Sequence, residues 1–498
     1  MSTTVAIHIG SKNSAACYGR SPVIPLIYQD HYEMNNVLCY SDGYTRLLFE
    51  TNVVNKENII RYPLRLFDLA LNNIEGRAIT DQSFGSPVVQ FNQSLYFHLS
   101  NGSMKSCDDA ILDIIRFIYY EAKRMSTEIS SLSLTIPSYY SYEMRDRLNK
   151  CIQRAEITSR GLFTEAECLV LNKVYSQEKY KEERSNYFVL LIGAVVCEGS
   201  FIKVSEGRLT EYPIFYERNL GGDKIDELLL NYCDDILKKD GFDIYEGNKK
   251  ENMVKLLEHI KQSKELLLDD ECIEFPKLKG SQPVEIDEEK YIEIIKPLID
   301  KIKKNIVNGF ALERDRMDDP DISIDKVTKV ICSGKLLTEQ PPFQNEIMKL
   351  FSVEPINCGV NEELEGCLRH LQCEKDKAMT LLHPLKYSIG IGLDNNRAKR
   401  IISAGSLLPA KNSLIWRQNG LLKNEVNTAL FYGDMFISMP VLGGLKRLLT
   451  IREKSGDFVT HYLFRTKLEV STDGVLTISI VNMKDKELYK KSMMLPFY

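Results

Sequence analysis

Near its amino end the chain reads Val5-Ala6-Ile7-His8-Ile9-Gly10-Ser11-Lys12-Asn13-Ser14-Ala15-Ala16-Cys17-Tyr18. Apolar residues flank the Gly-Ser-Lys-Asn segment on both sides, and this pattern predicts two strands joined by a tight turn. The backbone N–H groups at the tip of such a hairpin can point at a phosphate. Hairpins of this kind occur in many proteins, so its meaning depends on whether the pattern returns.

The pattern returns near residue 187, where the chain reads Tyr187-Phe-Val-Leu-Leu-Ile-Gly193-Ala-Val-Val-Cys-Glu-Gly-Ser-Phe-Ile-Lys-Val. Two such hairpins predict duplicated lobes that face a shared cleft, and ligands tend to bind in clefts of this kind. Two further turns follow, because Gly221-Gly222 precedes a helical pattern and Ser333-Gly334 follows an apolar strand. The Gly-Gly pair fits an anion-binding turn and an ordinary helix start equally well.

Strand and helix patterns alternate between these turns. Apolar side chains recur at helical spacing over 107–125, and a strand that ends at Pro137 leads into a second helical run at 143–155. A short strand then runs into a helix that begins near Glu165, which completes a right-handed crossover unit. Further helices are predicted at 249–268 and 288–309. The sequence therefore predicts an α/β fold for this part of the chain.

The pattern changes at 377–384. Beyond this segment the helical periodicity gives way to short alternating strands, with turns such as Asn419-Gly420 and Asp473-Gly474. We expect residues 1–376 to form one domain, 377–384 a linker, and 385–498 a separate, mostly antiparallel β domain. Few residues follow its last strand, so no further helical domain is expected.

Composition predicts a soluble protein of the cytoplasm or nucleus, and of these we expect a cytoplasmic location. The net charge of −5 and the pI near 6.0 give no reason to expect direct DNA binding or an anionic membrane surface as partner. From its opening residues and its apolar runs we expect neither a leader sequence nor a membrane-spanning segment. The 12 cysteines include no CxxC pair and the seven histidines show no ligand spacing, so we expect buried reduced thiols and no metal site.

The order of these parts, together with several short motifs, resembles the heat-shock protein 70 chaperone family. In that family an actin-like, two-lobed ATPase domain precedes a β-sandwich that holds peptides. The most specific matches are Ala6-Ile-His-Ile-Gly-Ser-Lys-Asn-Ser14, Leu134-Thr-Ile-Pro-Ser-Tyr-Tyr140, Asn219-Leu-Gly-Gly222, Ser403-Ala-Gly-Ser-Leu-Leu-Pro-Ala-Lys411 and Leu468-Glu-Val-Ser-Thr-Asp-Gly-Val-Leu-Thr-Ile-Ser-Ile-Val481. The resemblance covers nearly the whole chain.

The resemblance implies a cofactor, ATP with Mg²⁺, and a set of residues that contact it. In this sequence the matching positions are Gly10, Ser11, Lys12, Asn13, Gly193, Gly221, Gly222, Lys264, Ser333 and Gly334. We take these residues as the candidate nucleotide site.

The catalytic positions depart from the family pattern. His8 stands where the family has an aspartate that organises metal-bound water, Leu64 stands for the catalytic lysine, and Val195-Val196 replace glycine and threonine of the second phosphate loop. Neither imidazole nor isobutyl can do the work of these groups around Mg²⁺ and the phosphoryl oxygens. Glu165 survives, either as a remnant of the catalytic set or as an ordinary helix-start carboxylate. We assign no catalytic residue and no metal ligand.

A pseudo-ATPase follows from these replacements. ATP, if it binds, is expected to bind without a strict need for Mg²⁺. Lys12 and Lys335 are the cations that we expect near enough to replace the lost lysine.

The linker and the β domain have also diverged. Lys377-Ala-Met-Thr-Leu-Leu382 is less apolar at its start than the family's linker, so we expect it not to dock on the first domain, and the two domains to fold independently. Asp394 aligns with the methionine that arches over bound peptide, and a carboxylate there disfavours apolar peptides. The family's helical lid is not expected.

Among members of the family, this lidless and hydrolysis-deficient pattern resembles the regulatory subunit of the ribosome-associated complex. The resemblance implies a regulatory chaperone whose partners are a J-domain co-chaperone, another chaperone of the family and the ribosome. Two alternatives remain open. One is a slow ATP-dependent peptide-binding chaperone, and the other is a nucleotide-exchange factor for another chaperone.

Overall fold

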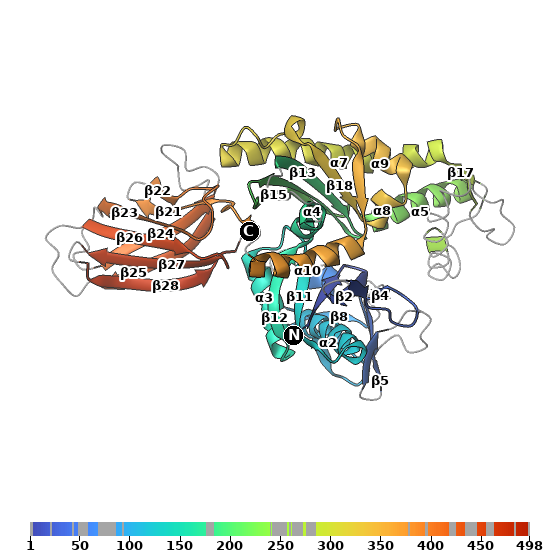
Figure 1. Ribbon diagram of the computed structural model, residues 1–498, viewed down its shortest axis with the longest axis horizontal. Helices are drawn as coiled ribbons and strands as arrows, with labels where there is room; N and C mark the ends of the chain where they lie inside the picture. Colours follow the sequence, from blue (N-terminus) through green and yellow to red (C-terminus); the bar gives the residue numbers. More distant parts are fainter. Residues whose placement is uncertain are drawn as a thin grey trace.

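The computed structural model describes residues 3–19, 22–41, 44–47, 58–67, 86–91, 94–175, 184–239, 241, 256–257, 260, 272–274, 285–376, 379–393, 397–417, 425–433, 446–454, 463–482 and 485–496. Two lobes that contain both helices and strands are followed by a region made almost entirely of strands (Figure 1). Two of the expected features, Lys264 and Asp394, lie outside the described residues, as does most of the helix expected at 249–268.

The first lobe is organised around the opening hairpin. Its main sheet has the order β12-β11-β1-β2-β3, with β4 also paired to β2. Strand β1 pairs antiparallel with β2 and parallel with β11, so the hairpin lies inside the sheet. The strands are β1 (Thr3–Ile9), β2 (Asn13–Gly19), β3 (Val23–Pro25), β4 (Glu33–Asn35), β11 (Ile129–Ile136) and β12 (Thr158–Thr164).

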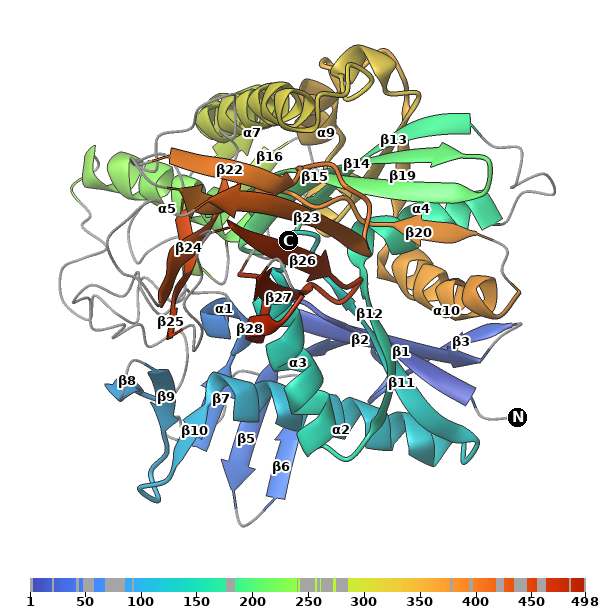
Figure 2. The same cartoon turned by 90° about the vertical axis from the view of Figure 1, so that its left-hand side faces the viewer.

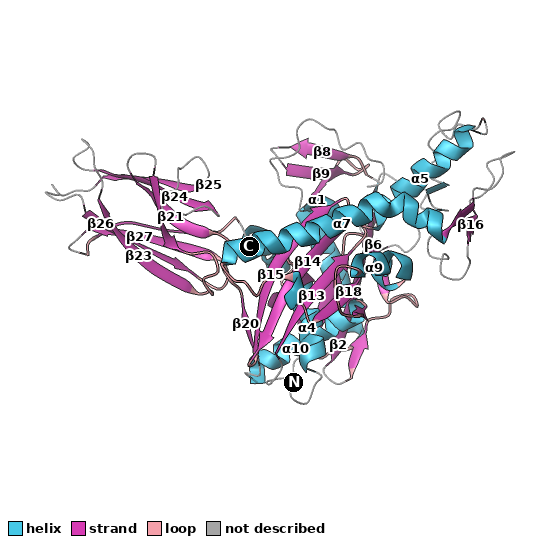
Figure 3. Ribbon diagram, turned by 90° about the horizontal axis from the view of Figure 1, so that it is seen from above, coloured by secondary structure: helices cyan, strands magenta, loops and turns pink. Residues whose placement is uncertain are grey.

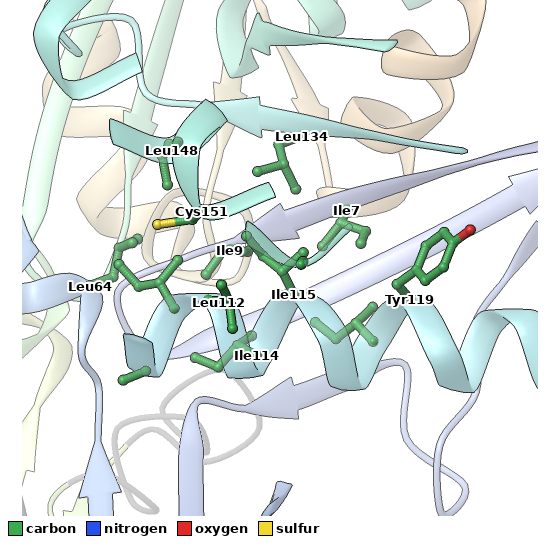
Figure 4. Packing of buried hydrophobic residues seen from close by; sticks show 14 of the residues in the cluster. Ile7, Ile9, Leu64, Leu112, Ile114, Ile115, Tyr119, Leu134, Leu148 and Cys151 are labelled. Atoms are coloured by element: carbon green, nitrogen blue, oxygen red, sulfur yellow. The ribbon is translucent and has the colours of Figure 1, made fainter. Parts of the chain in front are cut away.

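Helices α2 (Cys107–Met125) and α3 (Tyr142–Arg154) belong to this lobe, and α2 has the bounds that its periodicity predicts. Ser106 and Asp109 form a capping box that fixes the start of α2. The buried face of α2 joins the core under the sheet, where Ile7, Ile115 and Leu134 meet (Figure 4). Smaller elements complete the lobe: β5 (Val37–Ser41), β6 (Tyr44–Leu47), β7 (Ile59–Arg61), α1 (Leu64–Phe67), β8 (Val88–Phe91), β9 (Ser94–His98) and β10 (Met104–Ser106).

The second lobe repeats the arrangement around the second hairpin. Its sheet has the order β19-β18-β13-β14-β15-β20, in which β13 pairs antiparallel with β14 and parallel with β18. These strands are β13 (Arg184–Ile192), β14 (Val196–Ser205), β15 (Arg208–Arg218), β18 (Lys329–Ser333), β19 (Pro355–Cys358) and β20 (Thr380–Leu382), and a two-stranded sheet is formed by β16 (Cys272–Glu274) and β17 (Glu285–Asp287).

Helices of the second lobe are α5 (Gly222–Lys239), α7 (Glu288–Met317), α8 (Lys335–Thr338) and α9 (Pro341–Met348). The helix expected at 288–309 runs on to Met317 and contains Pro297. Its buried isoleucines, including Ile295, Ile299 and Ile302, pack on the sheet together with Phe188 and Phe201. Helices α4 (Glu165–Tyr175) and α10 (Val360–Asp376) lie against one another where the lobes meet, and α10 also contacts β1 and β2.

The strand-rich region consists of two four-stranded sheets, β22-β21-β24-β25 and β23-β26-β27-β28, which share one core that includes Ile391, Leu430, Leu468 and Ile478. Figure 2 shows this region facing the viewer in front of the two lobes. Its strands are β21 (Ser388–Leu393), β22 (Arg397–Ile402), β23 (Ala410–Arg417), β24 (Glu425–Gly433), β25 (Lys446–Lys454), β26 (Leu463–Val470), β27 (Val475–Asn482) and β28 (Glu487–Met494).

The linker differs from the expectation. Thr380–Leu382 forms β20, which pairs parallel with β15 and extends the sheet of the second lobe at its edge (Figure 3). The expectation that this segment does not dock is therefore wrong. Sheet pairing uses backbone N–H and C=O groups, which every non-proline residue carries, so a less apolar linker can still form it.

The β region also packs directly on the lobes. Tyr142, the first residue of α3, is buried in the same hydrophobic cluster as the core of the β region. A Cβ atom on Gly474 would lie 2.0 Å from Cγ of Tyr142, so the turn before β27 rests on the tyrosine ring. The Arg316 guanidinium lies 5.1 Å from the centre of the Tyr387 ring. These contacts argue against the expected independence of the two domains.

Within the described ranges no helix is both long and apolar enough to cross a membrane.

Candidate functional site

A cleft of about 360 Å³ lies between the two lobes. Eight of the ten expected site residues line it: Gly10, Ser11, Lys12, Asn13, Gly193, Gly222, Ser333 and Gly334. Gly221 lies directly behind, since a Cβ atom on it would be 2.5 Å from the carbonyl carbon of Ala194. Lys264 is outside the described residues. The turns that the sequence identified therefore come together, although they lie far apart in the chain.

The hairpin tips are closed by their own backbone hydrogen bonds. Gly10 N donates to Asn13 O at 2.8 Å, and Gly193 N donates to Val196 O at 2.9 Å. Gly222 N donates to Gly193 O at 3.0 Å, which ties the start of α5 to the second hairpin. Because the Gly222 amide is already engaged, the Gly-Gly pair acts here as a helix start that is held against the cleft wall.

Gly334 lets the turn after β18 lie directly against the backbone at the end of β13, in the floor of the cleft. It has φ of 101°, a conformation that side chains disfavour, and a Cβ atom on it would lie 2.0 Å from the carbonyl oxygen of Ile192. The ends of β13 and β18 can therefore meet at this turn only if the residue is glycine.

The centre of the cleft holds an ionic cluster of one histidine and two glutamates. His8 Nδ1 lies 2.9 Å from Oε1 of Glu363 and 3.7 Å from Oε1 of Glu165. His8 comes from β1, Glu165 begins α4 and Glu363 lies in the first turn of α10. Three elements thus bring their side chains to one point, and the cluster spans 355 residues of sequence between His8 and Glu363.

The electrostatics of the cluster favour a protonated histidine. Burial alone lowers the pKa of His8, but the carboxylates of Glu363 and Glu165 outweigh it and raise the pKa to about 9. Burial, followed by the Glu363 carboxylate, raises the pKa of Glu165 to about 8 despite the opposing effect of His8. At neutral pH His8 is therefore a cation set between acids, at the position where the resemblance implies a metal-organising aspartate.

A smaller pocket of about 100 Å³ adjoins the cleft on the side where the resemblance places the catalytic lysine. Leu64, Val195 and Val196 line it. Leu64 also belongs to the core cluster of the first lobe, and Figure 4 shows it among those side chains. None of these three side chains can donate a hydrogen bond or carry a charge.

The expectation that Lys12 and Lys335 are the cations near this site was incomplete. Arg65 and Arg218 also line the small pocket. Arg65 Nη1 lies 2.7 Å from Oδ2 of Asp223 in the second lobe, and Arg218 Nη2 donates to the backbone oxygen of Arg65 at 2.8 Å. Lys335 Nζ lies 3.6 Å from Oε2 of Glu33. Both ion pairs link the two lobes across the cleft.

Sequence reasoning missed Glu363, Arg65 and Arg218. Arg65 directly follows Leu64 and could have been considered there. Glu363 is one of two glutamates at the start of an amphipathic helix, and nothing in that local pattern distinguishes it from an ordinary helix-start carboxylate.

Comparisons with known proteins agree with this architecture. The family model described as "Hsp70 protein" matches residues 110–492, which is more than half of the chain, so the chain belongs to the Hsp70 family. Among its relatives is a protein named "Chaperone protein HscA homolog" from Acinetobacter baylyi, 20% identical over 431 residues, which cover 82% of this chain and 65% of the relative.

Two further relatives are similarly distant. A protein of the same name from Pasteurella multocida is 21% identical over 81% of this chain and 64% of its own length. "Chaperone protein DnaK" from Ureaplasma urealyticum is 23% identical over 47% of this chain and 39% of its own length. The chain thus spans slightly less than two thirds of the length of the first two relatives.

Proposed function

We propose that this chain is a divergent Hsp70-family chaperone or co-chaperone that assists protein folding as a regulatory partner and does not hydrolyse ATP. In this proposal residues 1–376 form an actin-like nucleotide-binding domain, 377–384 a linker and 385–498 a β-sandwich. The observation that carries the proposal is the 2.9 Å contact between His8 Nδ1 and Glu363 Oε1 in the centre of the cleft.

A nucleotide fits the residues that form this cleft. Glycine turns at Gly10, Gly193 and Gly334 let backbone approach a ligand without a side chain in the way. Lys12 lines the same cleft and supplies positive charge, which suits phosphate oxygens.

Magnesium does not fit the same centre. Mg²⁺ prefers oxygen ligands in octahedral geometry, whereas the centre here holds an imidazolium that repels a cation. Leu64 lines the pocket at the position where the resemblance implies the catalytic lysine, and its isobutyl group cannot stabilise charge on the transferring phosphoryl group. We infer that ATP serves as a structural ligand.

Nucleotide titration calorimetry with and without EDTA tests this part of the proposal. Equal ATP affinities under both conditions are expected, because the His8–Glu363 ion pair occupies the centre of the cleft where Mg²⁺ would otherwise bind. A large loss of affinity on chelation would show that Mg²⁺ is needed and would overturn the inference about the cleft.

The partners that we propose are a J-domain co-chaperone and a second, active Hsp70 chaperone, acting in the cytoplasm and at the ribosome. A cleft without turnover can still hold the two lobes in one arrangement, and a fixed arrangement suits a lasting partner better than cyclic client release. Affinity purification at low salt with mass spectrometry tests this. A J-domain protein recovered together with ribosomal proteins is the expected result, and a collection of unfolded clients would contradict it.

One observation favours a second candidate, a slow ATP-dependent peptide-binding chaperone. Arg65 and Arg218 line the pocket next to Leu64 and could supply the positive charge that the missing lysine gave. Arg65 is already paired with Asp223, however, so it would have to leave that ion pair to act on a phosphate. ATP turnover that is lost in Arg65→Ala would favour this candidate.

A further inference from the structure

A second cluster of acids and histidine lies outside the cleft, where the linker meets the lobes. Glu167 comes from α4, Glu211 from β15 and His383 directly follows β20. Each residue offers a ligand atom, and these atoms all lie within 4.8 Å of one another. The proposed nucleotide site plays no part in this cluster.

The pairing of β20 with β15 brings His383 close to Glu167 and Glu211. Strand β20 runs parallel to β15 with Thr210 opposite Leu382, so the next step along both strands brings Glu211 and His383 together. His383 Nε2 lies 3.9 Å from Oε2 of Glu167. The cluster therefore forms only when the linker is docked on the sheet.

Thr164 holds both carboxylates in place through one oxygen of each. Its backbone N donates to Glu167 Oε1 at 2.9 Å, and its hydroxyl donates to Glu211 Oε2 at 2.7 Å. The other two oxygens, Glu167 Oε2 and Glu211 Oε1, are buried and have no hydrogen-bond partner among the described residues. Glu167 is 2% exposed and Glu211 0% exposed. Buried carboxylate oxygens without a partner are costly, so their arrangement needs an explanation.

Two buried carboxylates and one imidazole meet in this cluster. A neutral imidazole can bind a metal ion through a ring nitrogen. Arg145 supplies one positive charge nearby, and its Nε donates to the backbone oxygen of Tyr140 at 3.0 Å.

We propose that Glu167, Glu211 and His383 bind a transition-metal ion of the zinc class, which fastens the linker to the lobes. One imidazole nitrogen and two carboxylate oxygens suit Zn²⁺, while Mg²⁺ and Ca²⁺ prefer oxygen ligands alone. Three protein ligands would leave the fourth tetrahedral position of the ion to a water molecule. The ligand atoms would close in from their present spacing to reach bonding distances of roughly 2.0–2.2 Å.

Such an ion would cross-link the linker to the lobes. It would join β15 and α4, which belong to the lobes, to the segment that leads into the β region. Binding would then stabilise the docked linker and reduce its exposure to proteases, and it would do so with no change in the cleft.

Titration of dialysed, metal-free protein with ZnCl₂ tests the proposal, with calorimetry and the thermal unfolding midpoint as readouts. One ion is expected to bind at this site and to raise the midpoint. His383→Gln and Glu211→Gln should each weaken Zn²⁺ binding at least tenfold, and His98→Gln, which changes an exposed histidine on β9, should leave it unchanged. His8, Glu165 and Glu363 also offer ligand atoms, so the titration is repeated in His8→Gln. This variant should still bind Zn²⁺ at Glu167, Glu211 and His383.

Co²⁺ spectroscopy keeps the test decisive if a variant folds poorly. Wild-type protein should give visible Co²⁺ absorption bands that Zn²⁺ removes, and Zn²⁺ should slow tryptic cleavage after Lys375, Lys377 and Lys386. The proposal is overturned if wild type binds no Zn²⁺, or if folded His383→Gln gives the same affinity and the same Co²⁺ spectrum. In either case a proton shared by Glu167 and Glu211 explains the buried oxygens.

Discussion

His8 decides what the centre of the cleft can hold. A carboxylate at this position would place three acids together and would need a metal ion to balance them. The imidazole instead contacts Glu363 at 2.9 Å and carries the balancing charge within the chain. The charge at this point is therefore balanced by an ion pair between β1 and α10.

This ion pair makes stability depend on pH. The pKa of His8 is raised from 6.5 to about 9 in the folded state, so its contribution is fully present below pH 6.5 and is lost as the pH rises through 9. The pKa of Glu165, raised from 4.5 to about 8, acts in the same direction over that range. We expect the free energy of unfolding, measured with urea, to fall as the pH rises from 6.5 to 9. In His8→Gln the free energy of unfolding should fall less steeply with pH. An unchanged dependence on pH would contradict the assignment of this effect to His8.

Restoring the aspartate should restore a need for metal. His8→Asp removes the cation and adds a carboxylate beside Glu165 and Glu363, so we expect a lower thermal midpoint in EDTA. Millimolar Mg²⁺ should recover part of the loss, because three carboxylates suit that ion. His8→Asn is the matched control, which loses the cation without gaining a charge and should gain no stability from Mg²⁺. Equal responses of both variants would contradict this account.

At this scale the sequence predicts the turns better than the charges. Gly10, Gly193 and Gly334 were found because a tight turn needs glycine at a particular place next to a strand, which is a local signal. Glu363 was missed because its partner lies 355 residues away. The ion pairs Arg65–Asp223 and Lys335–Glu33 depend in the same way on how the lobes close.

Among the elements, the linker departs most from its prediction. Helix α2 was predicted at its observed bounds because a long amphipathic pattern defines it. Strand β20 has only three residues, and its pairing depends on the open edge of β15, which no local periodicity reveals. Short strands at a sheet edge are set by their neighbours rather than by their own side chains.

The turn at Gly474 offers a test of the contact between the β region and α3. In Gly474→Ala a Cβ atom would lie 2.0 Å from Tyr142 Cγ. We therefore expect the contact between the β region and α3 to be broken. Gly102→Ala is the matched control. The φ of Gly102 is 79°, close to the 75° of Gly474, but no atom lies within 4 Å of the added Cβ. Faster tryptic cleavage near Lys375 and Lys386 is expected only in Gly474→Ala. Equal cleavage of both variants would show that backbone strain alone is responsible.

Over the whole molecule, the order of the parts was the most predictable feature. Two hairpin-centred lobes followed by a β region were expected from the repeated strand–turn–strand pattern and from the change near residue 377, and the structure has this order. How the parts contact one another was not predictable, because Tyr142, Gly474, Arg316 and Tyr387 each look like ordinary residues in their own elements. Contacts between domains arise from surfaces that only the folded lobes create.

The central claim is that the cleft holds nucleotide without hydrolysing it. Steady-state ATP turnover by the purified chain in the presence of Mg²⁺ tests this most directly, with Gly334→Ala as the variant whose cleft floor cannot close. The account predicts turnover no higher than background for the wild type and for the variant alike. A wild-type rate within tenfold of an ordinary Hsp70 protein, abolished by Gly334→Ala, would contradict it.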